Sequence, residues 1–460
     1  MTSHPRKNKA GKRIRVPKLF STSDVNFVEI LRHSSKAFLI LVGATALQFI
    51  FDLLLAQRFG ADGYGIFYLC FSVVMVLALI GRLGIDRAVI KFIPAYMTEG
   101  RINAARGVSN ISVKTSLLFT VPMAILLYIS SDTLARSIFN EPSIASYLKI
   151  FAFAIPPFAL SYIYSGILKS LKKTGPSLFL ERISIYFVGI LSVLLLSSGW
   201  GIGAIITAFT LACYGTALAG ALLTSKYLYT VTPAISFSRR KLLLISGPLL
   251  FVMFATQMNG QASVLLLGVF GSTVDVGVFN VALKISMLMS IVLAAITTIS
   301  ATKISELYYS NQIKELELVL SKSSALAVIL ALPLLLLMTL FPNFLLALFG
   351  SEFLPGREAL VLLGIAQFIN ATLGASIFAL GLTGGERKLA LVVGTSLLVN
   401  ISLGFLLIPL FGVIGAGIAT SLTITLSNVI LVIVVKRTLG VWLLPFVALR
   451  SWARSALALK

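Results

Sequence analysis

The sequence predicts an all-α integral membrane protein of about twelve transmembrane helices, built as two six-helix lobes related by a pseudo-two-fold axis along the membrane normal. Three observations predict this fold class. Hydrophobic residues make up 58% of the 460 residues and charged residues only 12%, with a mean hydropathy of +0.98, so a soluble chain would lack polar surface. The apolar residues form blocks of about twenty, the length that crosses a bilayer as a helix. Motifs of the first half also recur in the second half.

Six apolar blocks in each half predict the individual spans. They cover residues 36–57, 66–90, 107–129, 147–170, 179–197 and 202–224, and then 242–268, 277–302, 321–340, 358–381, 388–408 and 413–435. We expect a basic cytoplasmic tail, a first lobe, a basic cytoplasmic linker, a second lobe and a basic interfacial tail, over residues 1–35, 36–225, 226–241, 242–436 and 437–460. The first block lacks a small-residue cleavage pattern, so we expect no cleaved signal peptide.

Repeated motifs indicate that the two halves descend from one six-span unit. Four markers keep nearly one offset, between 210 and 212 residues: Phe59 and Phe270, Phe67 and Phe279, Phe139 and Phe349, and Gly203 and Gly415. A unit with an even number of spans returns the chain to its starting side, so both halves share one orientation in the membrane. Transporters commonly bind their substrate at the interface between such repeats.

The distribution of basic residues predicts the orientation. Of the 38 Lys and Arg residues, 33 fall on the side that also holds the N-terminus, which the positive-inside rule assigns to the cytoplasm. We therefore expect a multi-pass protein of the cytoplasmic membrane with both termini inside. The basic N-terminal tail is expected to contact anionic lipid headgroups, and its charge alone does not indicate a nucleic-acid partner.

Two ionisable residues inside the predicted spans are candidates for a coupling or gating role. Asp52 lies in the first span and Lys284 in the eighth, each about 10 Å below the outer boundary at 1.5 Å per residue. Ionisable groups inside a membrane usually face a cavity or a partner. We hypothesise that Asp52 and Lys284 pair when the outer side is closed. Alternatively, Lys284 holds a substrate phosphate and Asp52 a coupling cation, or the two form a fixed buried pair.

A polar stripe accompanies Asp52 and recurs in the second half. Thr45 and Gln48 share one helical face with Asp52. Matching polar residues lie 211 residues later, at Thr256, Asn259 and Ser263. Two interpretations remain open: the stripes line a common wet cavity between the lobes, or they form hydrogen bonds between neighbouring helices.

Basic residues gather where the second span ends. Arg82, Arg87 and Lys91 follow one another there, with Asp86 four residues after Arg82. One interpretation is a basic funnel that meets an anionic headgroup, because the planar guanidinium can bond two phosphate oxygens at once. The other is a locally paired membrane boundary.

The sequence gives little support for a catalytic, redox or metal site. Cys70 and Cys213 stand alone in apolar blocks, and both histidines, His4 and His33, lie in the N-terminal tail. The sequence contains no nucleotide-binding loop, zinc spacing or nucleophile elbow. We therefore expect no enzyme activity and no cofactor.

Four segments together resemble a known family: FGADGYGIFYLCFSVV from Phe59, LGIDRAVIKFIPAY from Leu83, FGSTVDVGVFNVALKIS from Phe270 and LFGVIGAGIATSLT from Leu410. The chain resembles the polysaccharide (O-antigen type, Wzx-like) flippases of the MATE-like multidrug, oligosaccharidyl-lipid and polysaccharide exporter superfamily. The resemblance implies two lobes in a V, with spans one, two, seven and eight around a central, often cationic cavity. It also implies outward transport of a polyprenyl-diphosphate-linked oligosaccharide by alternating access, coupled to H⁺ or Na⁺.

Two rival functions follow from the same features. A MATE-like small-molecule exporter would use the same scaffold, but the membrane interior offers a cationic drug only Asp52. An integral membrane oligosaccharide polymerase or ligase would need a larger outer loop with catalytic groups, and the longest outer segments are under twenty residues. Other membrane proteins of polysaccharide assembly could act as partners of a flippase.

Overall fold

The computed structural model describes residues 25–196, 199–228, 235 and 237–442, and within these ranges it contains helices and turns but no strand. The helices of the first half are α1 (Val25–Gly81), α2 (Ile85–Thr98), α3 (Ile102–Thr133), η1 (Leu134–Ile138), α4 (Ile144–Ala152), α5 (Ile155–Ser170), α6 (Thr174–Leu178), η2 (Phe179–Ile183), α7 (Ser184–Leu195) and α8 (Ile202–Tyr227). Those of the second half are α9 (Arg239–Phe270), α10 (Thr273–Ser286), η3 (Met287–Met289), α11 (Ser290–Tyr309), α12 (Ile313–Leu340), α13 (Pro342–Ala347), η4 (Ser351–Gly356), α14 (Arg357–Leu373), α15 (Ala375–Leu382) and α16 (Glu386–Leu439). Most of both predicted tails lies outside these ranges.

Two of the helices reverse direction at a glycine. Gly60 in α1 and Gly412 in α16 have positive φ values of 66° and 51°, which glycine adopts at little cost. The hydroxyl of Tyr68 hydrogen-bonds the carboxylate of Asp52, although sixteen residues of straight helix would separate them by about 24 Å. Both α1 and α16 therefore contribute two spans each.

Counting the reversals confirms the predicted number of spans. Eight helices within the described ranges are long and apolar enough to cross a membrane, and two bent pairs, α4 with α5 and η4–α14 with α15, add two more. Because α1 and α16 each count twice, the total is the predicted twelve. One predicted span, 66–90, proves to be interrupted, since α1 ends at Gly81 and α2 begins at Ile85.

The backbone carries the same repeat as the sequence. Three turns of the first half have a residue with positive φ, and each has a counterpart with positive φ between 210 and 212 residues later. The pairs are Gly100 and Asn311, Asn140 and Gly350, and Lys172 and Gly384. The turns that need a positive φ thus recur at the spacing of the sequence repeat.

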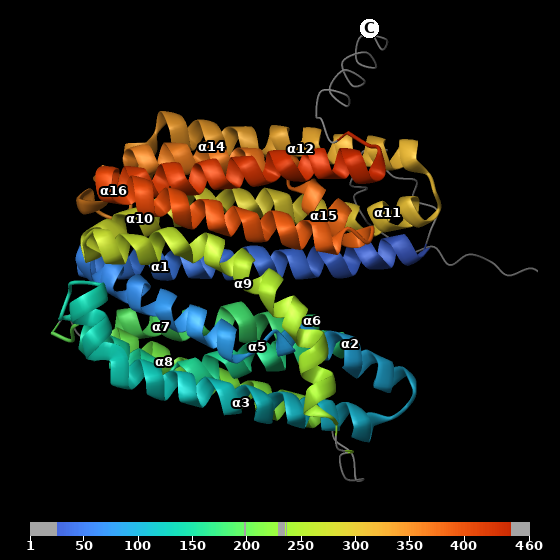
Figure 1. Cartoon of the computed structure of the whole chain (residues 1–460), viewed down its shortest axis with the longest axis horizontal. Coiled ribbons are helices and arrows are strands. Elements are labelled where there is room, and N and C mark those ends of the chain that lie inside the picture. Colours follow the sequence, from blue (N-terminus) through green and yellow to red (C-terminus); the bar gives the residue numbers. More distant parts are fainter. Residues whose placement is uncertain (1–24, 197–198, 229–234, 236, 443–460) are drawn as a thin grey trace, which may run out of the picture.

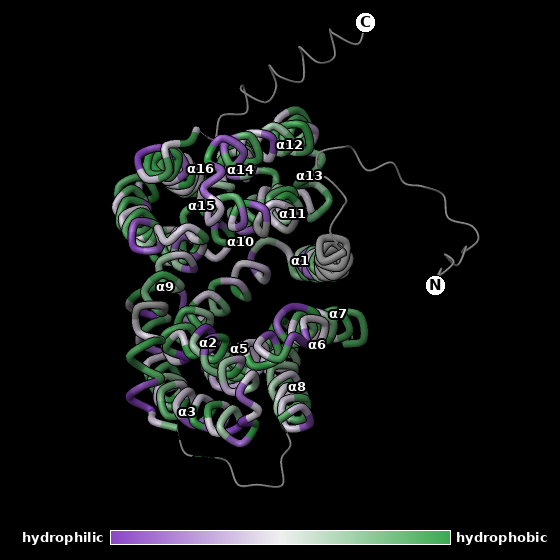
Figure 2. Tube along the Cα trace, turned by 90° about the vertical axis from the view of Figure 1, so that its right-hand side faces the viewer, coloured by the Kyte–Doolittle hydropathy of each residue, from purple (hydrophilic) through white to green (hydrophobic). Residues whose placement is uncertain are grey.

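Among the described side chains, the two lobes share an apolar core at one end of the bundle only. We call the end where α1 reverses the Gly60 end and the opposite end, where α2 lies, the Lys91 end. At the Gly60 end one continuous cluster includes residues of both lobes, such as Phe67 of α1 and Phe353 of η4. Towards the Lys91 end the clusters are separate, one in each lobe, around Ile163 and around Leu380. Figure 2 shows the two groups of helices from the Lys91 end.

Helix α9 passes from one lobe to the other. Figure 1 shows it crossing diagonally between the two groups of helices. Leu242 near its start belongs to the apolar cluster of the first lobe. Ala255 and Ala262 further along pack against Leu397 of α16 in the second lobe. This single helix therefore connects the lobes where their cores are separate.

Candidate functional site at the lobe interface

Asp52 and Lys284 both contact Tyr68 at the interface between the lobes, Asp52 at its hydroxyl and Lys284 at its ring. The Asp52 side chain is buried (1% exposed) and accepts a hydrogen bond from the Tyr68 hydroxyl. The ammonium group of the half-buried Lys284 lies 4.8 Å from the centre of the Tyr68 ring. The two charges also attract each other electrostatically. We call Asp52, Tyr68 and Lys284 the polar centre.

Arg182 extends the polar centre and was missed by the sequence interpretation. It lies on the π-helix η2, four residues before Tyr186, whose ring packs 5.8 Å from that of Phe51 in α1. After Asp52, the exposed Arg182 is the next charge that acts on Lys284. A signal was available, because Arg182 lies inside the apolar block 179–197, although a basic residue so near the end of a block is also typical of an inner boundary.

Helix α9 presents different polar residues to the first lobe than the repeat predicts. The amide oxygen of Gln261 accepts a hydrogen bond from the Ser72 hydroxyl at 2.8 Å, and Gln257 contacts the Met75 sulfur at 2.7 Å. Both partners belong to the second half of α1. Gln257 and Gln261 are four residues apart and so share one face of α9. This face meets the first lobe.

The predicted stripe on α9 lies against α16 instead. The hydroxyl of Ser263 is 2.7 Å from that of Thr420, and the Asn400 amide donates to the backbone carbonyl of Asn259 at 3.0 Å. Of the two interpretations left open, hydrogen bonding between helices describes Asn259 and Ser263. Thr256 is exposed and bonds a carbonyl of its own helix.

The other two residues of the predicted stripe in the first span lie away from the polar centre. Thr45 and Gln48 are both half-buried, and the Thr45 hydroxyl donates to the Leu41 carbonyl of the same helix at 2.9 Å. They lie on the same half of α1 as Asp52 but nearer the Lys91 end. The structure does not bring them into hydrogen-bond contact with the polar centre.

The three basic residues at the end of the second span separate. Arg82 is buried, with its guanidinium 4.2 Å from the centre of the Tyr162 ring on α5. Arg87 and Lys91 are exposed on α2. The structure therefore buries Arg82 beside α5 and leaves Arg87 and Lys91 accessible.

The Gly60 end is closed by close contacts between helices of the two lobes. A Cβ on Gly65 would lie 1.8 Å from the Thr273 carbonyl oxygen, and one on Gly277 would lie 2.1 Å from that of Ala61. Glycine at both positions thus lets the second half of α1 meet α10 backbone to backbone. The Glu352 carboxylate also accepts a hydrogen bond from the Ala61 amide at 2.8 Å.

Comparisons with known proteins agree with this architecture. Residues 34–301 match the family described as polysaccharide biosynthesis protein. The chain belongs to this family. It is 24% identical to a probable low-salt glycan biosynthesis flippase of Haloferax volcanii over 408 residues, 88% of this chain and 83% of the relative. Its fold is similar to an inward-facing multidrug resistance MATE family transporter (TM-score 0.74, 16% identity, 86% of this chain and 94% of the other) and to the lipid II flippase MurJ in an inward closed conformation (TM-score 0.70, 16% identity, 86% and 87%).

In this polysaccharide biosynthesis protein, the polar centre joins the spans that the resemblance implied. The first and second spans carry Asp52 and Tyr68, the seventh reaches the second through Gln261, and the eighth carries Lys284. The fifth span adds Arg182. Within the described ranges, no group of three or more His, Cys, Asp or Glu side chains could hold a metal ion.

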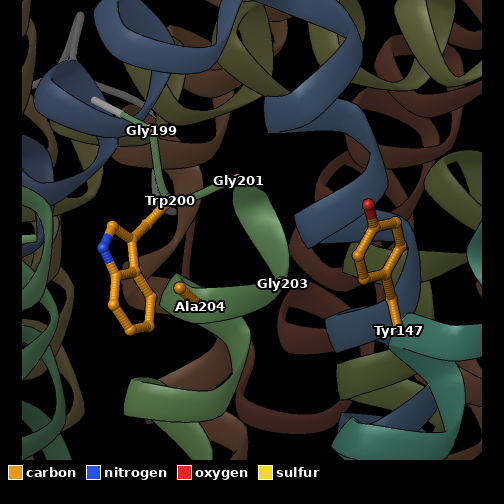
Figure 3. A pocket seen from close by; sticks show the side chains of 6 residues that line it. All are labelled: Tyr147, Gly199, Trp200, Gly201, Gly203 and Ala204. Carbon is orange, nitrogen blue, oxygen red and sulfur yellow. The ribbon is translucent and has the colours of Figure 1, made fainter. Parts of the chain in front are cut away.

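A surface depression of this family member lies apart from the polar centre. Figure 3 shows Tyr147 of α4 and Trp200 on either side of it, with Gly203 and Ala204 at the start of α8. These residues lie in the first lobe near the Gly60 end. None of its lining residues carries a charge, so it offers no ionic contact to a phosphate.

Proposed function

We propose that this chain is a flippase that moves a polyprenyl-diphosphate-linked oligosaccharide from the inner to the outer leaflet of the cytoplasmic membrane, for surface polysaccharide biosynthesis. One observation carries the proposal. Asp52, Tyr68 and Lys284 meet at the interface of two lobes whose described side chains form a shared apolar core at only one end. A charged side chain in the middle of a span costs about 2.5–3.5 kcal/mol on insertion, so such a cluster needs a function that requires charge.

The separate cores at the Lys91 end suggest how the substrate enters. The basic residues of the turns gather at this end, which the positive-inside rule assigns to the cytoplasm. The lobes part there, the diphosphate and sugars pass between them, and the polyprenyl chain stays in the bilayer. Lys284 and Arg182 attract the phosphates. Closing the Lys91 end and opening the Gly60 end would then release the headgroup outside.

The polar centre also offers a coupling mechanism. Asp52 binds the coupling ion, H⁺ or Na⁺, and its neutralisation weakens the attraction between Asp52 and Lys284. If this attraction holds the Gly60 end closed as a gate, the Gly60 end would open when the ion is bound. Exchanging the charges tests this. Asp52→Lys and Lys284→Asp should each abolish transport and the double variant should regain part of it, whereas no rescue would count against the gate.

The name of the Haloferax relative and the family match both support a glycan substrate. The likeness to the MATE transporter shows the shared fold but not a shared cargo. Along the interface, the three cations Lys284, Arg182 and Arg82 outnumber the two carboxylates Asp52 and Asp86 by one. This excess of positive charge favours an anionic headgroup over a cationic drug.

Transport in vesicles tests the function. Proteoliposomes containing the purified chain would be loaded with a fluorescent lipid-linked oligosaccharide, and its appearance in the opposite leaflet would be followed by quenching with dithionite. An imposed proton or sodium gradient should accelerate the movement. Equal rates in protein-containing and protein-free vesicles, with every gradient, would exclude the proposed function.

A further inference from the structure

The first lobe carries a groove on the side that faces the bilayer. The groove lies between α3, α8 and the end of α4 and has a volume of about 500 Å³. Its lining includes Tyr128, Lys149, Phe153, Thr210, Leu211 and Tyr214. Figure 2 shows α3 and α8 on the side of the first lobe that is away from the second lobe. Leu211 and Phe153 are 64% and 55% exposed, so their apolar surface meets hydrocarbon rather than the lobe interface.

A proline bend forms one wall of the groove. Helices α4 and α5 meet at an angle of 45° around Phe153. Pro156 and Pro157 have no amide hydrogen, so the helical hydrogen bonds to the carbonyls of Ala152 and Phe153 cannot form. At the bend the Phe153 ring packs edge-on against Tyr128 of α3, with the ring centres 5.7 Å apart. The sequence thus places an aromatic wall at this height of the bundle.

The groove is as deep as one leaflet of a membrane. Helix α8 begins at Ile202 near the Gly60 end, and Tyr214 lies twelve residues further, about 18 Å along the helix at 1.5 Å per residue. Half of a hydrocarbon core of about 30 Å is about 15 Å. A lipid of the leaflet at the Gly60 end therefore matches the groove in length.

Charged groups lie at the mouth of the groove. The Lys149 ammonium pairs with the Asp132 carboxylate at 2.6 Å, and the two side chains are 36% and 53% exposed. The exposed Arg136 also acts on Asp132 electrostatically. Among these three groups, two cations surround one carboxylate. Lys149 also lines the groove, so a phosphate at its mouth would meet this ammonium group.

Thr210 offers a hydrogen-bond donor inside the groove. The residue is 5% exposed, and its hydroxyl has no hydrogen-bond partner among the described residues. By contrast, the hydroxyl of Thr207, one turn earlier, donates to the Gly203 carbonyl at 2.8 Å. A buried hydroxyl without a partner is unfavourable, and most are satisfied. The Thr210 hydroxyl is therefore available to an oxygen atom of a ligand in the groove.

We propose that this groove is a binding site for a phospholipid of the leaflet at the Gly60 end. The lipid phosphate lies at Lys149, and the Thr210 hydroxyl donates to an ester oxygen. One acyl chain lies along Leu211 and Tyr214. Lys149 turns readily from Asp132 to the phosphate, because an exposed ion pair contributes little. The site goes beyond the proposed function, since it faces the bilayer and not the passage between the lobes.

Photo-crosslinking tests the site. The full-length chain in phosphatidylcholine nanodiscs would receive phosphatidylglycerol with a diazirine on one acyl chain, and mass spectrometry would identify the labelled peptides. Labelling should concentrate on α3 and α8 at the groove. Leu211→Trp fills the groove and should lower this labelling about fivefold. Leu218→Trp is the matched control, because Leu218 is 61% exposed, lies two turns further on the same face of α8 and is outside the groove.

The polar groups are tested one at a time. Thr210→Val should lower labelling about threefold, the effect of one hydrogen bond, whereas Thr207→Val should leave it unchanged. Lys149→Met should lower labelling, and Asp132→Asn should raise it by freeing Lys149. A pair with only a structural role would instead change labelling in the same direction in Lys149→Met and Asp132→Asn, and this result would overturn the headgroup contact.

Three further results would contradict the proposal. Equal labelling of α8 and of α12, the counterpart of α3 in the second lobe, would indicate only the general layer of lipid around the protein. Equal effects of Leu211→Trp and Leu218→Trp would show that the groove is not the labelled place. Stronger labelling by a photoreactive polyprenyl phosphate than by phosphatidylglycerol would assign the groove to the tail of another lipid. A photoreactive diacylglycerol, which lacks the phosphate, should label the groove about threefold less, and equal labelling would refute a phospholipid as ligand.

Discussion

The close glycine contact at the Gly60 end predicts that adding one methyl group will destabilise the closed arrangement of the two lobes. A Cβ at Gly65 would lie 1.8 Å from the Thr273 carbonyl oxygen, whereas ordinary contacts begin at 3.4 Å. Gly65→Ala therefore forces the second half of α1 away from α10 by more than 1 Å. Overpacking of this kind costs about 1–3 kcal/mol. If the open state relieves it, about 2 kcal/mol shifts the ratio of closed to open molecules about 30-fold.

Spin labels across the Gly60 end would report the shift. Asn140→Cys in the first lobe and Ser351→Cys in the second are both exposed positions, and the native Cys70 and Cys213 are buried. Gly65→Ala should increase the population at long distance, and Gly277→Ala should do the same. Gly43→Ala is the control, because nothing lies within 4 Å of the position that its new Cβ would take. Identical distance distributions for Gly65→Ala and the control would refute the reasoning.

Two further predictions concern contacts on either side of the polar centre. Glu352→Gln removes a negative charge from the first amide after the reversal at Gly60, where a helix N-terminus favours an anion by about 0.3–1 kcal/mol. The Gly60 end should then open about two- to fivefold more readily in the same spin-label measurement, and an unchanged distribution would exclude a role in closure. Asn400→Ala removes the hydrogen bond to the Asn259 carbonyl and should lower the free energy of unfolding by about 1–2 kcal/mol, visible as a lower midpoint in detergent. The ion dependence of transport should stay unchanged, since an altered one would indicate that these side chains bind the coupling ion.

The architecture could be predicted because the bilayer leaves few choices. A backbone in hydrocarbon must satisfy its hydrogen bonds internally, so each apolar block of about twenty residues has to be a helix. The repeat of Phe59 at Phe270 then predicted two lobes of the same orientation. Asp52 and Lys284 could be identified for the same physical reason, since a charge in an apolar block is costly enough to need an explanation.

The detailed contacts of the site could not be predicted from spacing. Tyr68 reaches Asp52 only because α1 reverses at Gly60, and a tyrosine near the end of a span is otherwise common. On α9 the repeat selected Ser263, yet Gln261 meets the first lobe, because the rotation of a helix depends on packing against both neighbours. In the turn of residues 82–84 between α1 and α2, Gly84 was the one residue that indicated a break in the helix. Nothing in the sequence indicated the positive φ of Leu83.

The central claim is that Lys284 attracts an anionic headgroup at the interface between the lobes. Its most direct test is the initial rate at which proteoliposomes move a labelled lipid-linked oligosaccharide between leaflets, for the wild-type chain, Lys284→Arg and Lys284→Met. We predict that the arginine variant keeps most of the rate and that the methionine variant, similar in size but uncharged, loses at least tenfold. Equal rates for all three chains, at equal protein content and stability, would contradict the claim.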